Sequence, residues 1–202
     1  MIEVRPSGGR VTQILRSDAQ DNRDRILAAA RTLFSERGLD VGMREVARHA
    51  EVGPATLYRR FPTKQSLIDE AFQVEMRTCR AVVEEGCADP DPWHGFTSVI
   101  ERLTALDVRN RGFVDAFLSI AHSSAAFAQH RRELLGMLDG LATRAKAQGR
   151  LRPDFVVDDL VLMLLAGRGL GSVSLSRRDA AARRFAGLAI DAFRTDRAAS
   201  AG

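Results

Sequence analysis

The sequence predicts an all-α protein of about nine helices. Apolar residues recur three and four positions apart along most of the 202 residues, as they do on one face of an α-helix. No segment keeps the alternation of apolar and polar residues that is typical of a half-buried strand. Turn-forming residues separate the periodic segments, as in the Pro-rich stretch at 88–92. We therefore expect helices joined by short loops.

Two short helices with a tight connection are predicted within residues 43–64. In the first, apolar residues three and four apart form one stripe, and the small side chain of Ala47 permits a close crossing. Pro54 suits the first turn of the second helix, where its missing N–H would be unpaired in any case. Leu57 and Phe61, at i and i+4, are predicted to point inward. This pattern is typical of a helix-turn-helix, whose second helix enters the major groove of DNA.

Two motifs with fixed spacing lie within residues 23–72. The first helix ends in an F-x-x-x-G pattern at Phe34 and Gly38, and a T-L-Y-x-x-F-x-x-K string follows at 56–64. With these motifs, roughly a quarter of the chain resembles the TetR family of one-component bacterial transcription regulators. The resemblance implies an N-terminal three-helix DNA-binding domain, followed by a helical domain that binds a ligand and dimerises.

The sequence departs from the pattern of this family at the turn and at two helix starts. Glu51 stands where the family usually has Gly in a left-handed turn, which we expect to cost about 1 kcal/mol. Gly42 and Gly53 replace the usual Thr and Ser N-caps, at a cost of about a few tenths of a kcal/mol each. The motif is still expected to fold, without the phosphate contacts of those hydroxyls.

The resemblance also implies which side chains contact DNA. Arg bonds the acceptors of guanine, and Thr or Ala touches a thymine methyl group. The candidates for base edges are Thr56 and Arg59, with Pro54 and Ala55 close by. Contacts to phosphate fix the register without reading sequence. The candidates for phosphate are Arg44, Tyr58, Arg60 and Lys64.

Residues 1–21 have weak periodicity and are predicted to form a flexible basic arm. The arm carries Arg5, Arg10 and Arg16, and it is either a disordered tail or an extension that reaches DNA phosphate or the minor groove. The DNA-binding domain is predicted at 22–66, and its first helix is expected over about 22–37.

The second domain is predicted at 67–202. One continuous helix over about 64–85 is expected to link it to the DNA-binding domain. Further helices are predicted over about 93–106, 113–122, 124–148, 156–170 and 178–193. The last two are the most apolar and look like half of a four-helix bundle that a second subunit completes. The resemblance implies the same homodimer, formed through residues of about 154–194.

The resemblance implies a ligand cavity in the second domain, and large side chains there are candidates for its wall. At helical spacing these residues are core residues by default. His122 and Arg168 are polar groups on otherwise apolar helices, so each either lies satisfied in the interior or orients a small ligand. The candidate pocket residues are Met76, Trp93, Phe96, Phe113, Phe117, His122, Phe127, Met137, Leu138 and Arg168.

Composition favours a soluble globular protein, with 45% hydrophobic and 28% charged residues. The net charge of +4 is compatible with a polyanionic partner. No apolar run reaches the length of a membrane span, and the N-terminus lacks the apolar stretch of a signal peptide. A cytoplasmic protein without membrane association is therefore predicted.

Neither a metal, a cofactor nor an active site is predicted. Cys79 and Cys87 would lie about 12 Å apart along one helix, too far for a disulfide. The four His residues show no metal-ligand spacing, and no G-x-S-x-G, H-E-x-x-H or Cys–His pairing is present. The glycines at 167, 169 and 171 lack the spacing of a nucleotide-binding loop and favour close helix packing.

Together these patterns predict a homodimeric, sequence-specific transcription regulator, not an enzyme. Its partners would be a palindromic double-stranded operator and a small-molecule inducer that releases the repressor from DNA. Two other classes stay open: a nucleoid or structural DNA-binding protein without an inducer, and an enzyme in the C-terminal helical domain.

Overall fold

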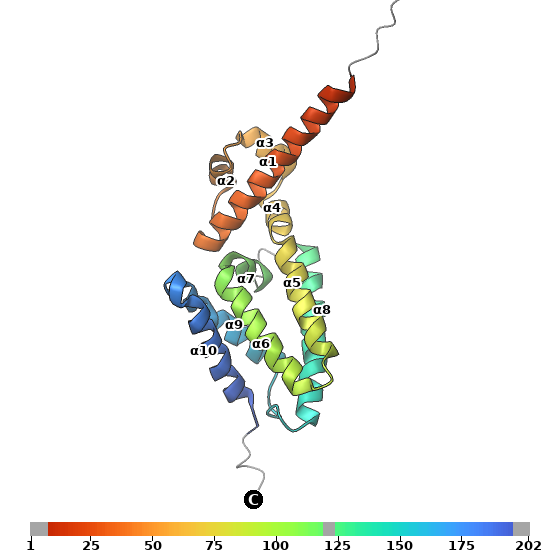
Figure 1. Ribbon diagram of the computed structural model, residues 1–202, viewed down its shortest axis with the longest axis vertical. Helices are drawn as coiled ribbons and strands as arrows, with labels where there is room; N and C mark the ends of the chain where they lie inside the picture. The colour runs from red at the N-terminus through yellow and green to blue at the C-terminus, as the bar shows by residue number, and fades with distance from the viewer. Residues whose placement is uncertain (1–7, 119–123, 196–202) are drawn as a thin grey trace, which may run out of the picture. The chain divides into compact units, whose positions relative to one another are not determined.

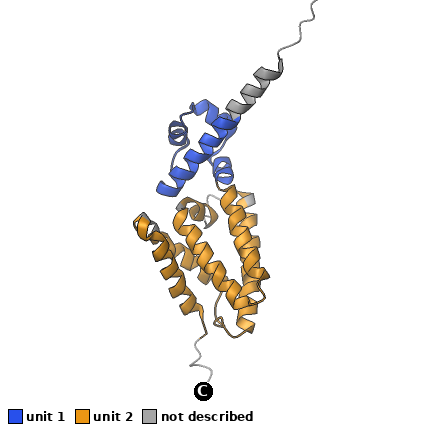
Figure 2. Ribbon diagram, in the orientation of Figure 1, with its two compact units in different colours: residues 1–71 blue, residues 72–202 orange. Residues whose placement is uncertain are grey.

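The computed structural model describes residues 8–118 and 124–195, with most side chains from Gln20 onward (Figure 1). Every regular element in these ranges is helical: ten α-helices and one 3₁₀-helix. The all-α prediction is confirmed. The chain divides into two compact units, residues 1–71 (unit 1) and 72–202 (unit 2) (Figure 2). The division falls five residues after the predicted domain boundary.

Unit 1 consists of α1 Gly8–Arg37, α2 Met43–His49, α3 Pro54–Arg60 and α4 Lys64–Ala71. Helix α1 packs against α2 and α4, and α2 packs against α3. Their shared core contains Ile26, Phe34, Val46, Leu57, Phe61 and Leu67, all nearly or fully buried. The inward prediction for Leu57 and Phe61 is confirmed.

Helix α1 begins earlier than predicted. It starts at Gly8 and not near Asn22, so residues 8–21 of the expected arm belong to a helix. Ile26 is the first residue of α1 that is described as buried. The apolar periodicity by which a helix start is recognised in the sequence therefore begins only where α1 packs against the core of unit 1. The first seven residues of the predicted arm, including Arg5, lie outside the described residues.

Unit 2 consists of α5 Gln73–Ala88, α6 Pro92–Arg109, α7 Arg111–Leu118, α8 Ala125–Ala147, α9 Val157–Gly167, the 3₁₀-helix η1 Arg168–Ser172 and α10 Leu175–Phe193. Helix α6 packs against α5, α8, α9 and α10 (Figure 1). Side chains from all of these helices therefore meet around α6.

The single helix predicted over 64–85 is wrong, because α4 and α5 are separated at Phe72. Phe72 has φ −102° and ψ 13°, outside the helical region, and its ring is fully buried against Phe113 at 5.9 Å between centroids. Neither Pro nor Gly marks this break in the sequence. It coincides with the division between the units.

Two glycines allow α5 and α6 to cross closely. A Cβ atom at Gly95 would lie 2.2 Å from the carbonyl oxygen of Gly86, and one at Gly86 would lie 2.3 Å from Cγ2 of Val99. No side chain fits at either position without moving backbone. Asp91 caps the start of α6 by accepting hydrogen bonds from the N–H groups of Trp93 and His94.

Candidate nucleic-acid interface and ligand cavity

The turn between α2 and α3 has the backbone geometry of a helix-turn-helix. Helix α2 ends at His49 with Ala50 as its C-cap, and Glu51 then takes a positive φ of 54°. The N–H of Val52 donates to the carbonyl of Ala47 at 3.0 Å, which closes the turn. Gly53 is extended at φ −65° and precedes Pro54, the first residue of α3. As expected for glycine, no side chain caps either α2 or α3.

Burial of one face of α3 leaves the opposite face outward. Leu57 within α3 and Phe61 after it are buried, and the residues around them are not. The eight predicted DNA-contacting residues lie on α2, on α3 and at the first residue of α4. Six are exposed and two are half-buried: Arg44, Pro54, Ala55, Tyr58, Arg59 and Arg60 in the first group, Thr56 and Lys64 in the second.

Charge on this surface is unevenly neutralised. Glu45 on α2 forms ion pairs with Arg37 and with Arg48, the latter at 3.7 Å. Neither Arg44 nor Arg59 has an acidic partner within the part of the chain that the structure describes. Both guanidinium groups are exposed, so they are available to an external polyanion such as a nucleic-acid backbone.

Unit 2 contains an apolar cavity of about 50 Å³. Helices α5, α6, α7, α8 and α9 all contribute to its wall. The lining residues are Cys79, Val83, Leu103, Leu106, Asp107, Phe113, Val114, Phe117, Leu134, Leu135, Leu138, Leu160, Val161 and Leu164. Twelve of these fourteen are hydrocarbon or aromatic, which leaves Cys79 and Asp107 as the exceptions. Such a wall suits a small apolar ligand.

Asp107 is the one carboxyl among the described residues of this wall. Its side chain belongs to a residue only 3% exposed, and Oδ1 has no hydrogen-bond partner among the described residues. Burial raises the pKa of Asp107 to about 7; the Arg168 guanidinium opposes this shift and the Asp115 carboxylate adds to it. Arg168 itself forms an ion pair with Asp115. Asp107 is therefore poised between its neutral and charged forms near neutral pH.

Cys79 contributes a neutral group to the cavity. It is buried, and burial raises the pKa of its thiol to about 12. Cys87, on the same helix, is half-buried and also free, as the spacing predicts. Nowhere in the described ranges do three His, Cys, Asp or Glu side chains come together to hold a metal ion.

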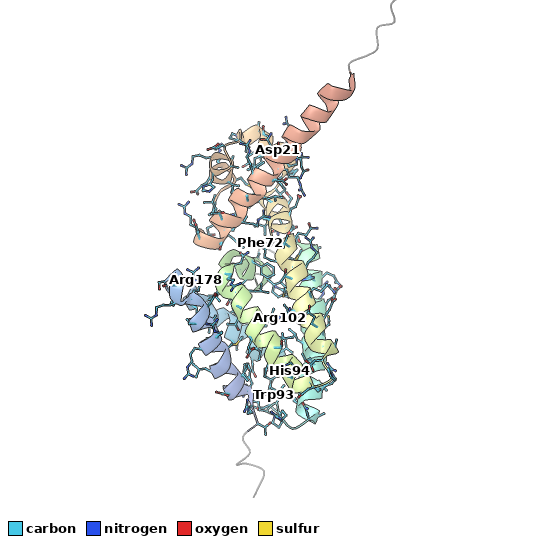
Figure 3. All side chains as sticks on the ribbon, viewed as in Figure 1. Asp21, Phe72, Trp93, His94, Arg102 and Arg178 are labelled. Atoms are coloured by element: carbon cyan, nitrogen blue, oxygen red, sulfur yellow. The ribbon has the colours of Figure 1, made fainter. Side chains whose placement is uncertain are left out.

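Three of the ten predicted pocket residues line this cavity: Phe113, Phe117 and Leu138. The structure places Trp93 and Phe96 elsewhere, stacked on each other at 5.9 Å and joined to Phe155. Trp93 and Phe72 lie at opposite ends of unit 2 (Figure 3). The rings of Trp93 and Phe96 fill an aromatic core and do not line the cavity.

Four other predicted pocket residues also lie off the cavity wall. Phe127 is buried in the first turn of α8, whereas Met76 and Met137 are half-buried on α5 and α8. Arg168 is held by Asp115. His122 lies outside the described residues.

The sequence prediction missed Asp107, although a signal was present. Asp107 follows Ile100 and Leu103 at i+7 and i+4, and both of these are buried on α6. An acidic residue in the inward register of an otherwise apolar helix is unusual, because burying an unpaired carboxylate is costly. The inward position of Asp107 and its acidic side chain are in conflict, and this conflict indicates a functional role for Asp107.

No helix within the described ranges is both long and apolar enough to cross a membrane.

The fold and these two sites define a class of protein: a DNA-reading helical unit joined to a helical unit with a cavity. Residues 26–71 match the profile of bacterial regulatory proteins of the tetR family, and residues 91–195 match that of the SbtR-like transcriptional regulator C-terminal domain. The chain belongs to the TetR family and is a ligand-responsive, DNA-binding transcriptional regulator.

Similarity to named transcriptional regulators supports this assignment. The chain is 30% identical over 148 residues to the HTH-type transcriptional repressor KstR of Mycobacterium tuberculosis, a match that covers 69% of this chain and 66% of that protein. The KstR of Mycolicibacterium smegmatis is 30% identical over 151 residues, covering 69% and 71%. Among solved structures, the TetR regulator SCO0520 from Streptomyces coelicolor is 31% identical, with a TM-score of 0.51 over 85% of this chain and 98% of that one.

Proposed function

We propose that the protein is a homodimeric repressor that binds a palindromic operator and leaves it when a small apolar molecule occupies the cavity of unit 2. The outward face of α3 carries this proposal. On that face Thr56 and Arg59 lie three positions apart, on a short helix whose other face is buried. A regulator that binds the bacterial chromosome acts in the cytoplasm, and this role requires no turnover of the ligand.

The eight residues divide into two roles in this proposal. Thr56 and Arg59 contact base edges, with Pro54 and Ala55 beside them. Four further side chains contact phosphate and set the register: Arg44, Tyr58, Arg60 and Lys64.

An unpartnered apolar face supports dimerisation through the last two helices. Val156, at the start of α9, is 56% exposed; Leu162 and Leu165 on α9 are 63% and 37% exposed, and Leu188 on α10 is 51% exposed. Large apolar side chains gathered on two neighbouring helices mark a contact with another chain. In a two-fold dimer, a pair of α3 helices would read half-sites about 34–36 Å apart, on successive turns of the major groove.

Leu162→Glu tests this dimer directly. A charge in the centre of the apolar face should give monomers in sedimentation and weaken binding to a two-half-site DNA. Thr143→Glu, on an exposed position of α8, is the control and should stay dimeric. A dimeric Leu162→Glu protein would place the interface elsewhere.

The cavity supports response to a ligand. A molecule larger than a few heavy atoms must push the wall of the 50 Å³ cavity apart, so it favours a conformer that differs from the one described. If that conformer binds the operator less tightly, ligand and DNA oppose each other reciprocally.

The experiment that tests the proposal is selection from randomised double-stranded DNA at two salt concentrations, followed by sequencing. Enrichment of a palindrome with half-sites one turn apart is the expected result. Tight binding without an enriched motif would overturn it in favour of a nucleoid or structural DNA-binding protein without sequence preference.

A further inference from the structure

We propose that the cavity of unit 2 selects an apolar amine, whose ammonium group pairs with Asp107. The inference rests on the proposed role of this cavity as the inducer site, and it names the class of inducer. Nothing else in the lining competes for this role, since the other thirteen residues are hydrocarbon, aromatic or, at Cys79, a neutral thiol.

The position of the carboxyl group carries the argument. Oδ2 of Asp107 lies under the backbone of α9, where a Cβ atom added to Gly167 would come within 3.1 Å of it. Oδ1 has no hydrogen-bond partner among the described residues, although the residue is 97% buried. Buried carboxyl oxygens are nearly always paired, so an unpaired one on a residue that lines a cavity indicates a partner that arrives from outside.

The surrounding charges favour a cation over an anion. Asp115 on α7 adds a second carboxylate near Asp107, and Arg168 on η1, the cation that acts on Asp107, is already paired with Asp115. Arg168 is not part of the cavity wall. With Asp107 ionised, the three groups carry a net charge of −1. A protonated amine neutralises that charge, whereas a ligand carboxylate would add a third negative charge.

A neutral ligand fits less well than an amine. A hydroxyl group can donate one hydrogen bond to Oδ1, but it leaves the charge of the carboxylate buried without a counter-ion. An ammonium group supplies both the donor and the charge. Helices α8 and α9 contribute only apolar side chains, which suit a hydrocarbon chain attached to the amine.

The small volume of the cavity favours a slender ligand. The cavity holds about 50 Å³, which is room for only a few water-sized groups. Leu135 and Leu164 on its wall are only half-buried, so these side chains can move outward. An unbranched alkyl chain enters such a space more readily than a rigid ring system.

The test compares three probes that differ only in the head group: hexylamine, 1-hexanol and hexanoate. Binding to the full-length protein is followed through Leu and Val methyl resonances at pH 8. We expect hexylamine to bind at least about tenfold more tightly than the other two, and Asp107→Asn to abolish that preference. Asp139→Asn, an exposed carboxyl on α8, is the matched control and should bind as the wild type does. Equal or tighter binding of hexanoate or hexanol would overturn the proposal.

The pH profile of the wild type gives a second readout that needs no variant. The titratable groups that face Asp107 are Arg168, Asp115 and, in the same cavity wall, Cys79, and the pKa of Asp107, about 7, lies inside the range from pH 5 to 8. Hexylamine affinity should rise about tenfold per pH unit up to about pH 7 and then level off, while hexanol affinity stays flat. A flat hexylamine profile would overturn the pairing with Asp107.

Operator release separates this inference from the proposed function. If hexylamine binds through Asp107 but leaves the operator complex intact, the class of ligand stands and its role as inducer fails. If a selected operator is bound and released by other compounds while hexylamine does not bind, the repressor stands and the amine inference fails.

Discussion

Gly167 on α9 lies directly over the carboxyl group of Asp107 on α6. A side-chain methyl group at Gly167 would come within 3.1 Å of Oδ2 of Asp107 and within 3.2 Å of Cε1 of Phe185. The absence of a side chain at this position therefore lets α9 approach α6 and Phe185 at once. The other carboxyl oxygen of Asp107, Oδ1, is buried and has no hydrogen-bond partner among the described residues.

Gly167→Ala should destabilise unit 2 by about 1–2 kcal/mol, because both Asp107 and Phe185 must shift to admit the methyl group. The measurement is the free energy of unfolding from urea denaturation. Gly140→Ala is the control: it lies on an exposed position of α8 with no atom within 4 Å of the added Cβ. That change should stabilise the protein by about 1 kcal/mol, as Ala does in a helix. Equal effects of the two substitutions would show that α9 does not pack tightly over Asp107.

Asp107 should make folding stability fall as pH rises through the neutral range. Its pKa rises from an ordinary value of 3.8 to about 7 in the folded protein, so the folded state holds the proton more tightly than the unfolded state does. The contribution of Asp107 to the free energy of unfolding should therefore be greatest below about pH 4, decline up to about pH 7 and stay level above it.

Asp107→Asn removes this titration and isolates its contribution. Between pH 5 and pH 8 the wild type should lose about 2–3 kcal/mol more stability than the variant. Urea denaturation at the two pH values measures this difference. Asp139→Asn should keep the wild-type slope, and an unchanged slope in Asp107→Asn would mean that the carboxyl is charged throughout this range.

Local sequence signals were sufficient where local chemistry decides the structure. The i, i+4 spacing of Leu57 and Phe61 identified the buried face of α3, and both side chains are buried. The residue type of Thr63 suits the start of α4, where its Oγ1 accepts a hydrogen bond from the N–H of Ser66. Gly149 ends α8 with a φ of +71°, a conformation that favours glycine.

Features set by distant contacts could not be predicted in the same way. The break at Phe72 follows from burial of its ring against Phe113, forty-one positions away. No turn-forming residue marks this break in the sequence. The cavity wall likewise depends on which faces of five helices oppose one another. Periodicity identifies Trp93 and Phe96 as inward-facing, but it does not say that their partner is Phe155 rather than a cavity.

Glu51 is the position at which a single substitution should stabilise unit 1. Its φ of 54° makes it the only non-glycine residue with a positive φ within the described ranges, and its side chain is exposed. Glu51→Gly should raise the free energy of unfolding by about 1 kcal/mol, because glycine adopts this conformation without strain. The control is Gly38→Ala, where φ is +79°, which should lower stability by a similar amount. If Glu51→Gly is neutral, entropy of the unfolded chain offsets the strain that is relieved.

Arg59 and Lys64 should affect DNA binding in different ways. Arg59 is exposed on the outer face of α3, whereas Lys64 is half-buried at the first residue of α4. An arginine that bonds a guanine edge contributes at one base pair, and a lysine on phosphate contributes equally at every sequence. Arg59→Ala should therefore relax preference at one position of each half-site, at a cost of about 1–3 kcal/mol on the selected operator.

Lys64→Ala should weaken binding to selected and scrambled DNA alike and reduce the slope of log affinity against log salt by about one unit. Titrations of both variants against both DNAs at several salt concentrations measure these effects. Arg48→Ala is a suitable control, because this exposed arginine on α2 pairs with Glu45 and has no proposed DNA contact. If Arg59→Ala weakens both DNAs equally, Arg59 contacts phosphate, and the residue that reads bases must be another on the outer face of α3.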